Sequence, residues 1–232
     1  MTPDRMTPDM SRTGEVPLRV VAFDLDGLMF NTEELYTEVG GQLLERRGKS
    51  ITRELLDQMM GRPSPVALQI MIDWHELDAT VSELEQETQV LFEKLLETRL
   101  EPLPGLLALL SSLESAGVPK AIATSSRRVF VDRVLDLQSM HERFDFILTC
   151  EDIVRGKPDP EIYHKVAQRF GVPAQQMLVL EDSENGCRSA VAAGAFVVAV
   201  PGVHTARHQY PGAAIIADTL QDRRIYQALG LV

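Results

Sequence analysis

Four short groups of acidic, hydroxyl and amine side chains in this sequence have the residue types that reactions at phosphate require. In chain order they are Asp24-Leu25-Asp26-Gly27, Thr124-Ser125-Ser126, Lys157 and Glu181-Asp182. Mg²⁺ prefers carboxylate oxygens, so Asp24 and Asp182, helped by Glu181, would hold the ion and leave coordination positions for a phosphate. A carboxylate that attacks a phosphate dianion needs positive charge beside it, which Mg²⁺ and Lys157 would supply. The residue types therefore predict a magnesium site that also binds phosphate.

The first group contains two carboxylates that can take different roles. Because Leu25 separates Asp24 from Asp26, the two side chains need not point in one direction. Asp24 could then attack phosphorus while Asp26 handles the proton of the leaving group. Gly27 supplies backbone freedom for the turn, and donors at residues 124–126 would bind the remaining phosphate oxygens. Each group alone is also typical of a turn, a helix N-cap or a solvated lysine. The prediction therefore depends on the side chains of all four groups lying close together in the fold.

The elements that must bring these groups together are buried strands. Residues 18–23 form a short apolar run, typical of a strand buried on both faces, that ends directly before Asp24. Further strands are expected, with helices between them, at residues 120–124, 144–149, 177–180, 196–200 and 214–217. This alternation predicts an α/β fold with a parallel sheet and helices on both of its faces. Ligands bind such sheets at the carboxyl ends of the strands, near the point where the strand order reverses.

One long segment between the first two strands carries only helical patterns. Within it, Ser82 and Glu85 are expected to form a capping box at the start of a helix. Residues 1–17 lack apolar periodicity and are rich in Pro, Asp and Thr, as a mobile tail would be. The sequence thus predicts, in order, a tail at 1–17, a catalytic core formed by 18–31 and 103–232, and a helical insertion at 32–102.

The overall composition excludes several classes of partner. The chain has 232 residues, and its 23 Lys and Arg against 34 Asp and Glu give a net charge of −11. This is the wrong sign for binding a nucleic-acid backbone. No apolar run approaches the roughly 20 residues of a membrane helix, and the first fifteen residues contain no hydrophobic stretch of signal-peptide type. We therefore expect a cytoplasmic protein that binds neither nucleic acid nor membrane; the sequence makes no prediction of its oligomeric state.

Taken in order, the four groups resemble the motifs of the haloacid dehalogenase superfamily, in particular its subfamily with a helical cap inserted after the first strand. The similarity runs from Val20 to Gly202. The segments similar to the four motifs are Asp24-Leu25-Asp26-Gly27, Thr124-Ser125-Ser126, Gly156-Lys157-Pro158-Asp159-Pro160 and Leu180-Glu181-Asp182-Ser183 with Gly186. The resemblance implies a Rossmann-like core with an inserted helical cap.

The resemblance also implies a magnesium-dependent phosphotransfer. In this reading Asp24 forms an aspartyl-phosphate, and Asp26 acts first as an acid and then as a base. The metal would be held by the Asp24 carboxylate, the Asp26 backbone carbonyl and Asp182, with Glu181 nearby. Dehalogenation is not expected, because the dehalogenating branch lacks the second aspartate that this chain has as Asp26.

The remaining predicted residues bind substrate. The resemblance implies that Thr124 and Lys157 bind the phosphate, with help from Ser125 and Ser126. Arg62 resembles a cap arginine that contacts substrate in this subfamily.

The cap at 32–102 would open and close over the site, excluding water and selecting the leaving group. One residue beside it departs from the pattern. Asn31 stands where many members have Asp before the hinge residue, here Thr32.

Phosphatases and β-phosphoglucomutase in this subfamily differ in what attacks the aspartyl-phosphate. The mutase relies on a cap histidine and a cap lysine. This chain has Tyr36 near the first position and Gln86 near the second, with no lysine between Arg62 and Lys94. Both departures favour a phosphatase acting on a small phosphorylated metabolite, such as a sugar phosphate or a similar phosphomonoester. The alternatives are a phosphosugar mutase and a non-catalytic phosphate-binding regulator.

Overall fold

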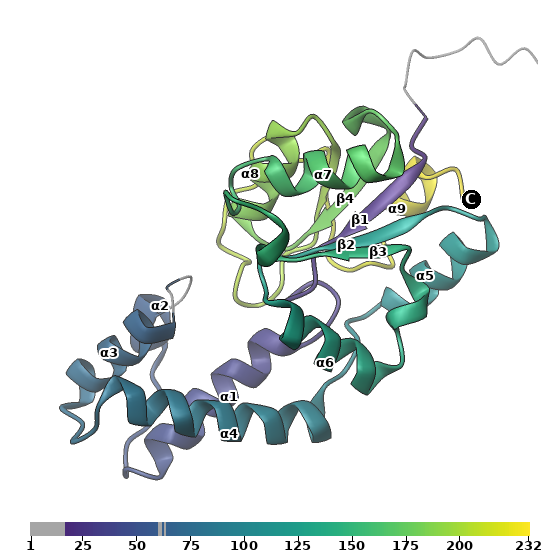
Figure 1. The fold of residues 1–232 in the computed structure, drawn as a ribbon. Helices are drawn as coiled ribbons and strands as arrows, with labels where there is room; N and C mark the ends of the chain where they lie inside the picture. Colours follow the sequence, from purple (N-terminus) through teal and green to yellow (C-terminus); the bar gives the residue numbers. More distant parts are fainter. Residues whose placement is uncertain (1–16, 60–61, 63) are drawn as a thin grey trace, which may run out of the picture.

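A computed structural model describes residues 17–59, 62 and 64–232 (Figure 1). Within these residues six strands form one parallel sheet in the order β3-β2-β1-β4-β5-β6. The strands are β1 Val20–Phe23, β2 Lys120–Ala123, β3 Phe146–Leu148, β4 Met177–Glu181, β5 Phe196–Ala199 and β6 Ile215–Ile216. The strand order reverses beside β1, between β2 and β4, which creates the crevice where ligands bind in sheets of this kind. The predicted α/β fold is confirmed.

Helices cover both faces of the sheet (Figure 1). They are α5 Leu106–Ser115, α6 Arg128–Gln138, α7 Glu161–Phe170, α8 Glu184–Ala192 and α9 Arg223–Ala228, with short 3₁₀ helices η1 His141–Arg143, η2 Cys150–Asp152 and η3 Ala174–Gln176. Alternate residues of β1 point to opposite faces. Val21 and Phe23 pack in the core cluster that contains α5 and α6, and Val20 and Ala22 pack in the one that contains α7 and α8.

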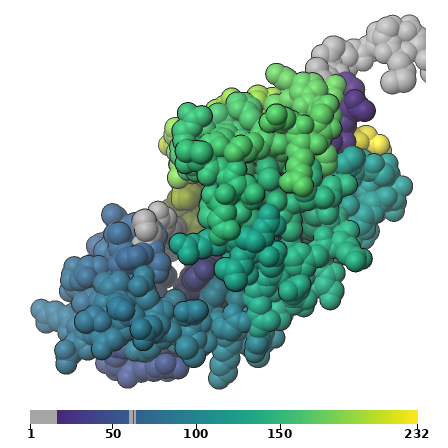
Figure 2. Space-filling view, in the orientation of Figure 1, coloured from purple at the N-terminus to yellow at the C-terminus, as the bar shows by residue number. Residues whose placement is uncertain are grey.

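A separate group of helices lies between β1 and β2 in the sequence and extends from one end of the molecule (Figure 2). This helical group consists of α1 Thr32–Glu45, α2 Arg53–Met59, α3 Ser64–His75 and α4 Val81–Arg99. These four helices fall inside the range predicted for the insertion. The further expectation that residues 32–102 fold as a separate domain stays a prediction. The predicted tail at 1–17 lies, except for Pro17, outside the described residues.

The predicted capping box of α4 is wrong by two residues. The Thr80 hydroxyl accepts a hydrogen bond from the backbone N–H of Glu83, whose carboxylate accepts from the backbone N–H of Thr80 at 2.7 Å. Ser82 already lies in the first turn of the helix. Both pairs share the Ser/Thr-x-x-Glu spacing, so the pattern alone does not fix which pair begins the helix.

The two connections between core and helical group lie side by side and are joined by Asn31. Its side-chain amide donates to the Arg99 carbonyl at 3.1 Å, and its side-chain oxygen accepts from the Glu101 N–H at 2.9 Å. The backbone N–H of Asn31 also donates to the Glu101 carbonyl. An aspartate has no side-chain donor and could not make the bond to Arg99, which gives a physical reason for asparagine at this position.

Further contacts seat α4 on the core helix α6. Arg133 on α6 pairs with Glu97 at 2.6 Å and also with Glu93. Phe130 on α6 stacks with Phe92 on α4 at a ring distance of 6.0 Å. The helical group is therefore held against the core by both charged and aromatic contacts.

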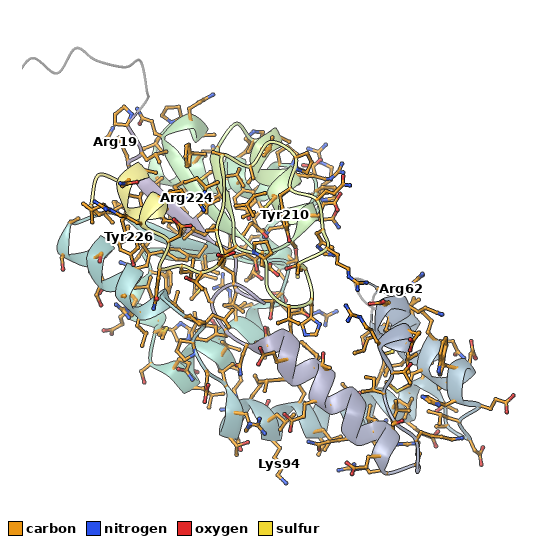
Figure 3. The ribbon with its side chains drawn as sticks, turned by 180° about the vertical axis from the view of Figure 1, so that it is seen from behind. Arg19, Arg62, Lys94, Tyr210, Arg224 and Tyr226 are labelled. Atoms are coloured by element: carbon orange, nitrogen blue, oxygen red, sulfur yellow. The ribbon has the colours of Figure 1, made fainter. Side chains whose placement is uncertain are left out.

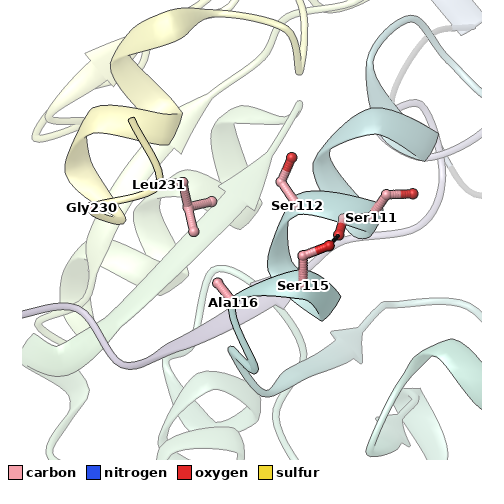
Figure 4. Close-up of a pocket in the computed structure, with 6 residues that line it drawn as sticks. All are labelled: Ser111, Ser112, Ser115, Ala116, Gly230 and Leu231. Carbon is pink, nitrogen blue, oxygen red and sulfur yellow. Dashed lines mark hydrogen bonds between the residues drawn. The ribbon is translucent and has the colours of Figure 1, made fainter.

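A surface pocket of about 460 Å³ lies between α5 and the C-terminal segment (Figure 4). It is lined by Ser111, Ser112, Ser115, Ala116, Gly230 and Leu231. Each of its three serine hydroxyls donates to a backbone carbonyl one turn earlier in α5, so these groups are already partnered. In the part of the chain that the structure describes, no helix has the length and apolar character needed to cross a membrane.

Gly105 and Gly117 provide a matched test of the packing at the start of α5. Both have positive φ values, +94° and +65°. A Cβ on Gly105 would lie 2.5 Å from the backbone nitrogen of Gln221, whereas a Cβ on Gly117 meets nothing within 4 Å. We expect Gly117→Ala to lower the free energy of unfolding by about 1 kcal/mol, the cost of backbone strain. Gly105→Ala should cost about 3 kcal/mol or more, because backbone must also move. Urea unfolding measures both, and equal losses would contradict the clash.

Candidate active site

The predicted residues meet at the carboxyl ends of the central strands. Asp24 follows β1, Thr124 follows β2, and Asp182 follows β4. Because Phe23 pairs with both Ile122 and Leu180 in register, these three strand ends lie at one edge. A cavity of about 530 Å³ opens there, which we call the carboxylate pocket. Its lining includes six predicted site residues: Asp24, Asp26, Thr124, Ser125, Lys157 and Asp182.

Lys157 forms the centre of the buried charge network. Its ammonium donates to Asp24 Oδ1 at 2.5 Å, to Glu181 Oε1 at 2.6 Å and to the Ala123 carbonyl at 2.9 Å. Three acceptors thus satisfy the three N–H bonds of a side chain that is only 5% exposed. Burial alone would lower the pKa of Lys157, but the carboxylates of Asp24 and Glu181 together raise it well above its usual range. The ammonium therefore stays charged beside Asp24.

Glu181 lies behind Lys157 and does not line the carboxylate pocket. Its carboxylate is fully buried and accepts hydrogen bonds from the Tyr163 hydroxyl at 2.7 Å and the Ser183 hydroxyl at 3.1 Å, besides the bond from Lys157. A Cβ on Gly186 would lie 1.9 Å from Glu181 Oε1, so only glycine fits beneath this carboxylate. The geometry suits Glu181 for positioning Lys157.

Asp26 is held by two hydroxyl groups from different parts of the chain. Its Oδ1 accepts from Thr32, the first residue of α1, at 3.0 Å, and its Oδ2 accepts from Ser126. Burial raises the pKa of Asp26, although both hydrogen bonds lower it. Asp26 is thus disposed to carry a proton at neutral pH more than an exposed aspartate would be. The Ser126 hydroxyl is engaged with Asp26 here, and its contact with phosphate stays a prediction.

The two carboxylates best placed for a cation are Asp24 and Asp182. Burial raises the pKa of Asp24 to about 7, opposed by Lys157 and increased by Glu181 and Asp26. Burial also raises the pKa of Asp182 well above its usual range, with further contributions from Glu181 and Asp24. Four acidic groups share this region with Lys157, so a divalent cation would relieve their repulsion.

The oxygen donors at this edge fit Mg²⁺. Carboxylate oxygens of Asp24, Glu181 and Asp182 lie within 4.8 Å of one another, and oxygen is the ligand that this ion prefers. Gly27 permits the arrangement, because it has φ +72° and its Cβ would lie 2.7 Å from Asp182 Oδ2. The buried negative charge and the hard donor set both favour a divalent cation.

The hydroxyl residues after β2 differ in exposure and in whether their hydroxyl group is free to bind a ligand. Thr124 is buried, and its Oγ1 accepts from the backbone N–H of Ser126 at 3.0 Å. Ser125 is exposed and lines the carboxylate pocket. The arrangement leaves Ser125 open to a ligand, while Thr124 shapes the turn.

Arg62 lies elsewhere, in a second cavity of about 390 Å³ that is lined mainly by α1, α2 and α3 and that we call the helical pocket. Its Nε donates to the Gln58 carbonyl at 2.8 Å. Figure 3 shows Arg62 on the helical group and Tyr210 on the core. The structure therefore does not bring Arg62 to the carboxylates, and its contact with substrate stays a prediction.

Two residues that join these cavities are not among those predicted from the sequence. Glu33 on α1 and His204 in the loop after β5 line both the carboxylate pocket and the helical pocket. His204 follows a strand end, so the rule that selected Asp24 and Thr124 could also have found it. Glu33 directly follows Thr32, but nothing in the helical pattern indicates the direction of its side chain.

Known proteins are similar to this chain in both sequence and structure. Residues 21–200 match a family model described as haloacid dehalogenase-like hydrolase. A probable pseudouridine-5'-phosphatase of Drosophila melanogaster is 33% identical over 210 residues, covering 86% of this chain and 89% of the relative. A phosphorylated carbohydrates phosphatase of Thermotoga maritima is 30% identical over 178 residues, covering 76% and 82%. The crystal structure of a putative beta-phosphoglucomutase from Thermotoga maritima has a TM-score of 0.78 at 26% identity, covering 92% and 98%.

The raised pKa of Asp24 predicts how stability depends on pH when no metal is bound. Between pH 4 and 7 the folded state binds more protons than the unfolded state, since the pKa of Asp24 is about 7 in the fold and near 4 in an unfolded chain. The free energy of unfolding of chelator-treated protein should therefore fall as pH rises through this interval. Urea unfolding at pH 4 to 8 measures the slope, and MgCl₂ should restore stability most at the upper end.

Two variants make this prediction specific. Asp24→Asn should make the pH dependence shallower, leaving the part due to Asp26 and Asp182, and should reduce the effect of MgCl₂. Asp78→Asn removes an exposed aspartate and should change neither. If all three proteins show the same slope and the same response to MgCl₂, Asp24 is not the group responsible.

Proposed function

Because this chain belongs to the haloacid dehalogenase-like hydrolases, we propose that it is a Mg²⁺-dependent phosphatase that hydrolyses a small phosphorylated metabolite through an aspartyl-phosphate. Its membership confirms the resemblance drawn from the four motifs, and phosphatases among its relatives identify it as a phosphoric monoester hydrolase. The observation that carries the proposed mechanism is the Lys157 ammonium bound to Asp24 in the lining of the carboxylate pocket.

In the first step an Asp24 oxygen attacks phosphorus, and the bond from phosphorus to the substrate alcohol breaks. Lys157 orients the Asp24 carboxylate and offsets the repulsion between it and the phosphate. Asp26 gives its proton to the departing oxygen, so that a neutral alcohol leaves. When bound by Asp24 and Asp182, Mg²⁺ supplies further positive charge that stabilises the transferring group.

In the second step Asp26 removes a proton from water, whose oxygen attacks phosphorus. The bond between phosphorus and Asp24 breaks, which releases inorganic phosphate and restores the carboxylate. The hydroxyls of Thr32 and Ser126 hold Asp26 in one orientation through both proton transfers. The exposed hydroxyl of Ser125 would bind a phosphate oxygen.

Two observations support hydrolysis over the mutase alternative. Tyr36, near the position of the mutase histidine, stacks on Phe92 with ring centres 4.0 Å apart and has no imidazole to transfer a proton to a sugar. Two relatives that are similar over most of this chain are named as phosphatases, not as mutases. The cytoplasmic location and the role of Arg62 in specificity stay predictions.

Replacement of the nucleophile tests the covalent mechanism. Asp24→Asn should reduce phosphate release from sugar phosphates and short phosphomonoesters at least a thousandfold, because the amide does not attack phosphorus. Chelation of Mg²⁺ should also suppress release by the wild type, and Asp78→Asn should retain it. The assay measures inorganic phosphate, with urea unfolding to show that the variants fold. Retained turnover in Asp24→Asn would refute the mechanism, and isomerised sugar phosphate without free phosphate would identify a mutase instead.

Replacement of the acid tests the role of Asp26. Asp26→Asn should lower kcat more for alkyl phosphates than for p-nitrophenyl phosphate, whose leaving group needs no proton. A difference of at least tenfold between the two losses is expected when kcat is measured at saturating substrate. Equal losses would remove Asp26 from the proton-transfer role.

A further inference from the structure

The carboxylate pocket and the helical pocket form a path for one ligand. Glu33 and His204 line both cavities, so a molecule with its phosphate beside Asp24 can pass these two residues into the helical group. Cavities of about 530 and 390 Å³ each lie within the size range of sites for small molecules. The leaving alcohol therefore has room for more than a short polyol.

The junction between the cavities is polar. His204 Nε2 lies 3.5 Å from the Thr37 hydroxyl, which itself donates to the Glu33 carbonyl at 3.1 Å. The Glu33 carboxylate adds an acceptor on the same side of α1. The Glu33 carboxylate and the His204 imidazole together offer hydrogen-bond acceptors and a donor. Such a pair can bind the hydroxyl groups of a sugar or polyol.

The loop that carries His204 is fixed to the core. The Thr205 hydroxyl accepts from the Gly202 N–H at 2.9 Å. The Tyr210 hydroxyl lies 2.7 Å from the Thr205 carbonyl and 2.8 Å from the Asp182 carbonyl, within donating distance of each. The backbone of the His204 loop is therefore tied to the core beside Asp182, while the imidazole also meets Thr37 of the helical group.

Beyond this junction the helical pocket is mainly apolar. Its lining includes Val39, Leu43, Ile51, Leu56, Leu68 and Met71. Thr88 also lines it, and the buried Thr88 Oγ1 has no hydrogen-bond partner among the described residues. That oxygen is shielded by the packing around it, so it offers the ligand no contact. The pocket thus fits the apolar faces of a ring.

We propose that the substrate is a phosphate ester whose alcohol is a sugar bearing an apolar-faced ring, as in a nucleoside monophosphate. The sugar hydroxyls contact Glu33 and His204, and the ring occupies the helical pocket against its apolar residues. This inference rests on the proposed function only in placing the phosphate beside Asp24.

The experiment compares esters that share phosphate and pentose and differ in the ring. We expect kcat/KM for uridine or adenosine 5'-monophosphate to exceed that for ribose 5-phosphate at least tenfold. Ala67 is half-buried and lines the helical pocket, whereas Val66 beside it is exposed and does not. Ala67→Phe should lower kcat/KM for the preferred nucleotide at least tenfold and for ribose 5-phosphate less than threefold. Val66→Phe, which adds the same ring outside the pocket, should change neither, and Ala67→Leu replaces Ala67→Phe if the latter does not fold.

Matched histidine variants test the junction. His204→Ala should reduce kcat/KM for both classes of sugar ester at least fivefold more than for p-nitrophenyl phosphate, which has no hydroxyl to bind. His164→Ala removes an exposed histidine of α7 and should not alter this ratio.

Several outcomes would overturn the inference while leaving the proposed function intact. These are equal or faster hydrolysis of ribose 5-phosphate, equal losses in Ala67→Phe for all esters, or an unchanged ratio in His204→Ala. If the wild type releases no phosphate from any ester, the proposed function fails. The inference is then tested by measuring the affinity of the protein for the same esters by calorimetric titration. Tenfold tighter binding of a nucleotide than of ribose 5-phosphate, lost in Ala67→Phe and kept in Val66→Phe, supports it; equal affinities overturn it.

Discussion

The contact of the Lys157 ammonium with Asp24 and Glu181 is the interaction on which the site depends. Carboxylates at the ends of buried strands lose most of their hydration, and without a compensating charge they would take up protons or repel one another. Lys157 supplies that charge from a loop outside the sheet. The surrounding residues serve this contact: Tyr163 donates to Glu181 from α7, and Gly186 leaves room for the Glu181 carboxylate under α8. The fold thus positions the Asp24 carboxylate by positioning its counterion.

The second aspartate is bound in a different way, by neutral hydroxyls. Because one of them belongs to Thr32 at the start of α1, Asp26 is attached to the point where the helical group begins. Asn31, the residue before it, joins the two connections between core and helical group. Movement of these helices would therefore act on Asp26, while leaving the Lys157 contact, which lies entirely in the core, undisturbed.

The sequence predicted those features that follow from chain periodicity. Alternating strands and helices were enough for the parallel sheet, and parallel strand ends were enough to bring Asp24, Thr124 and Asp182 together. Side-chain direction was not predictable in this way. Ser126 donates to Asp26, and Arg62 lies in the helical pocket. Neither placement was predictable, because each residue follows a turn whose path is not encoded in the periodicity of the sequence. His204 follows the end of β5 and could have been selected by the same strand-end rule, but the direction of its side chain, like that of Glu33, was not predictable.

The Tyr210 hydroxyl lies between the backbone of Asp182 and the loop that holds His204. A single side chain thus links the backbone of Asp182 to the loop that carries His204. Substitutions that reshape this loop would therefore also shift Asp182. The apolar residues that line the helical pocket are not tied to Asp182 in this way, so they could diverge between related chains without such a cost.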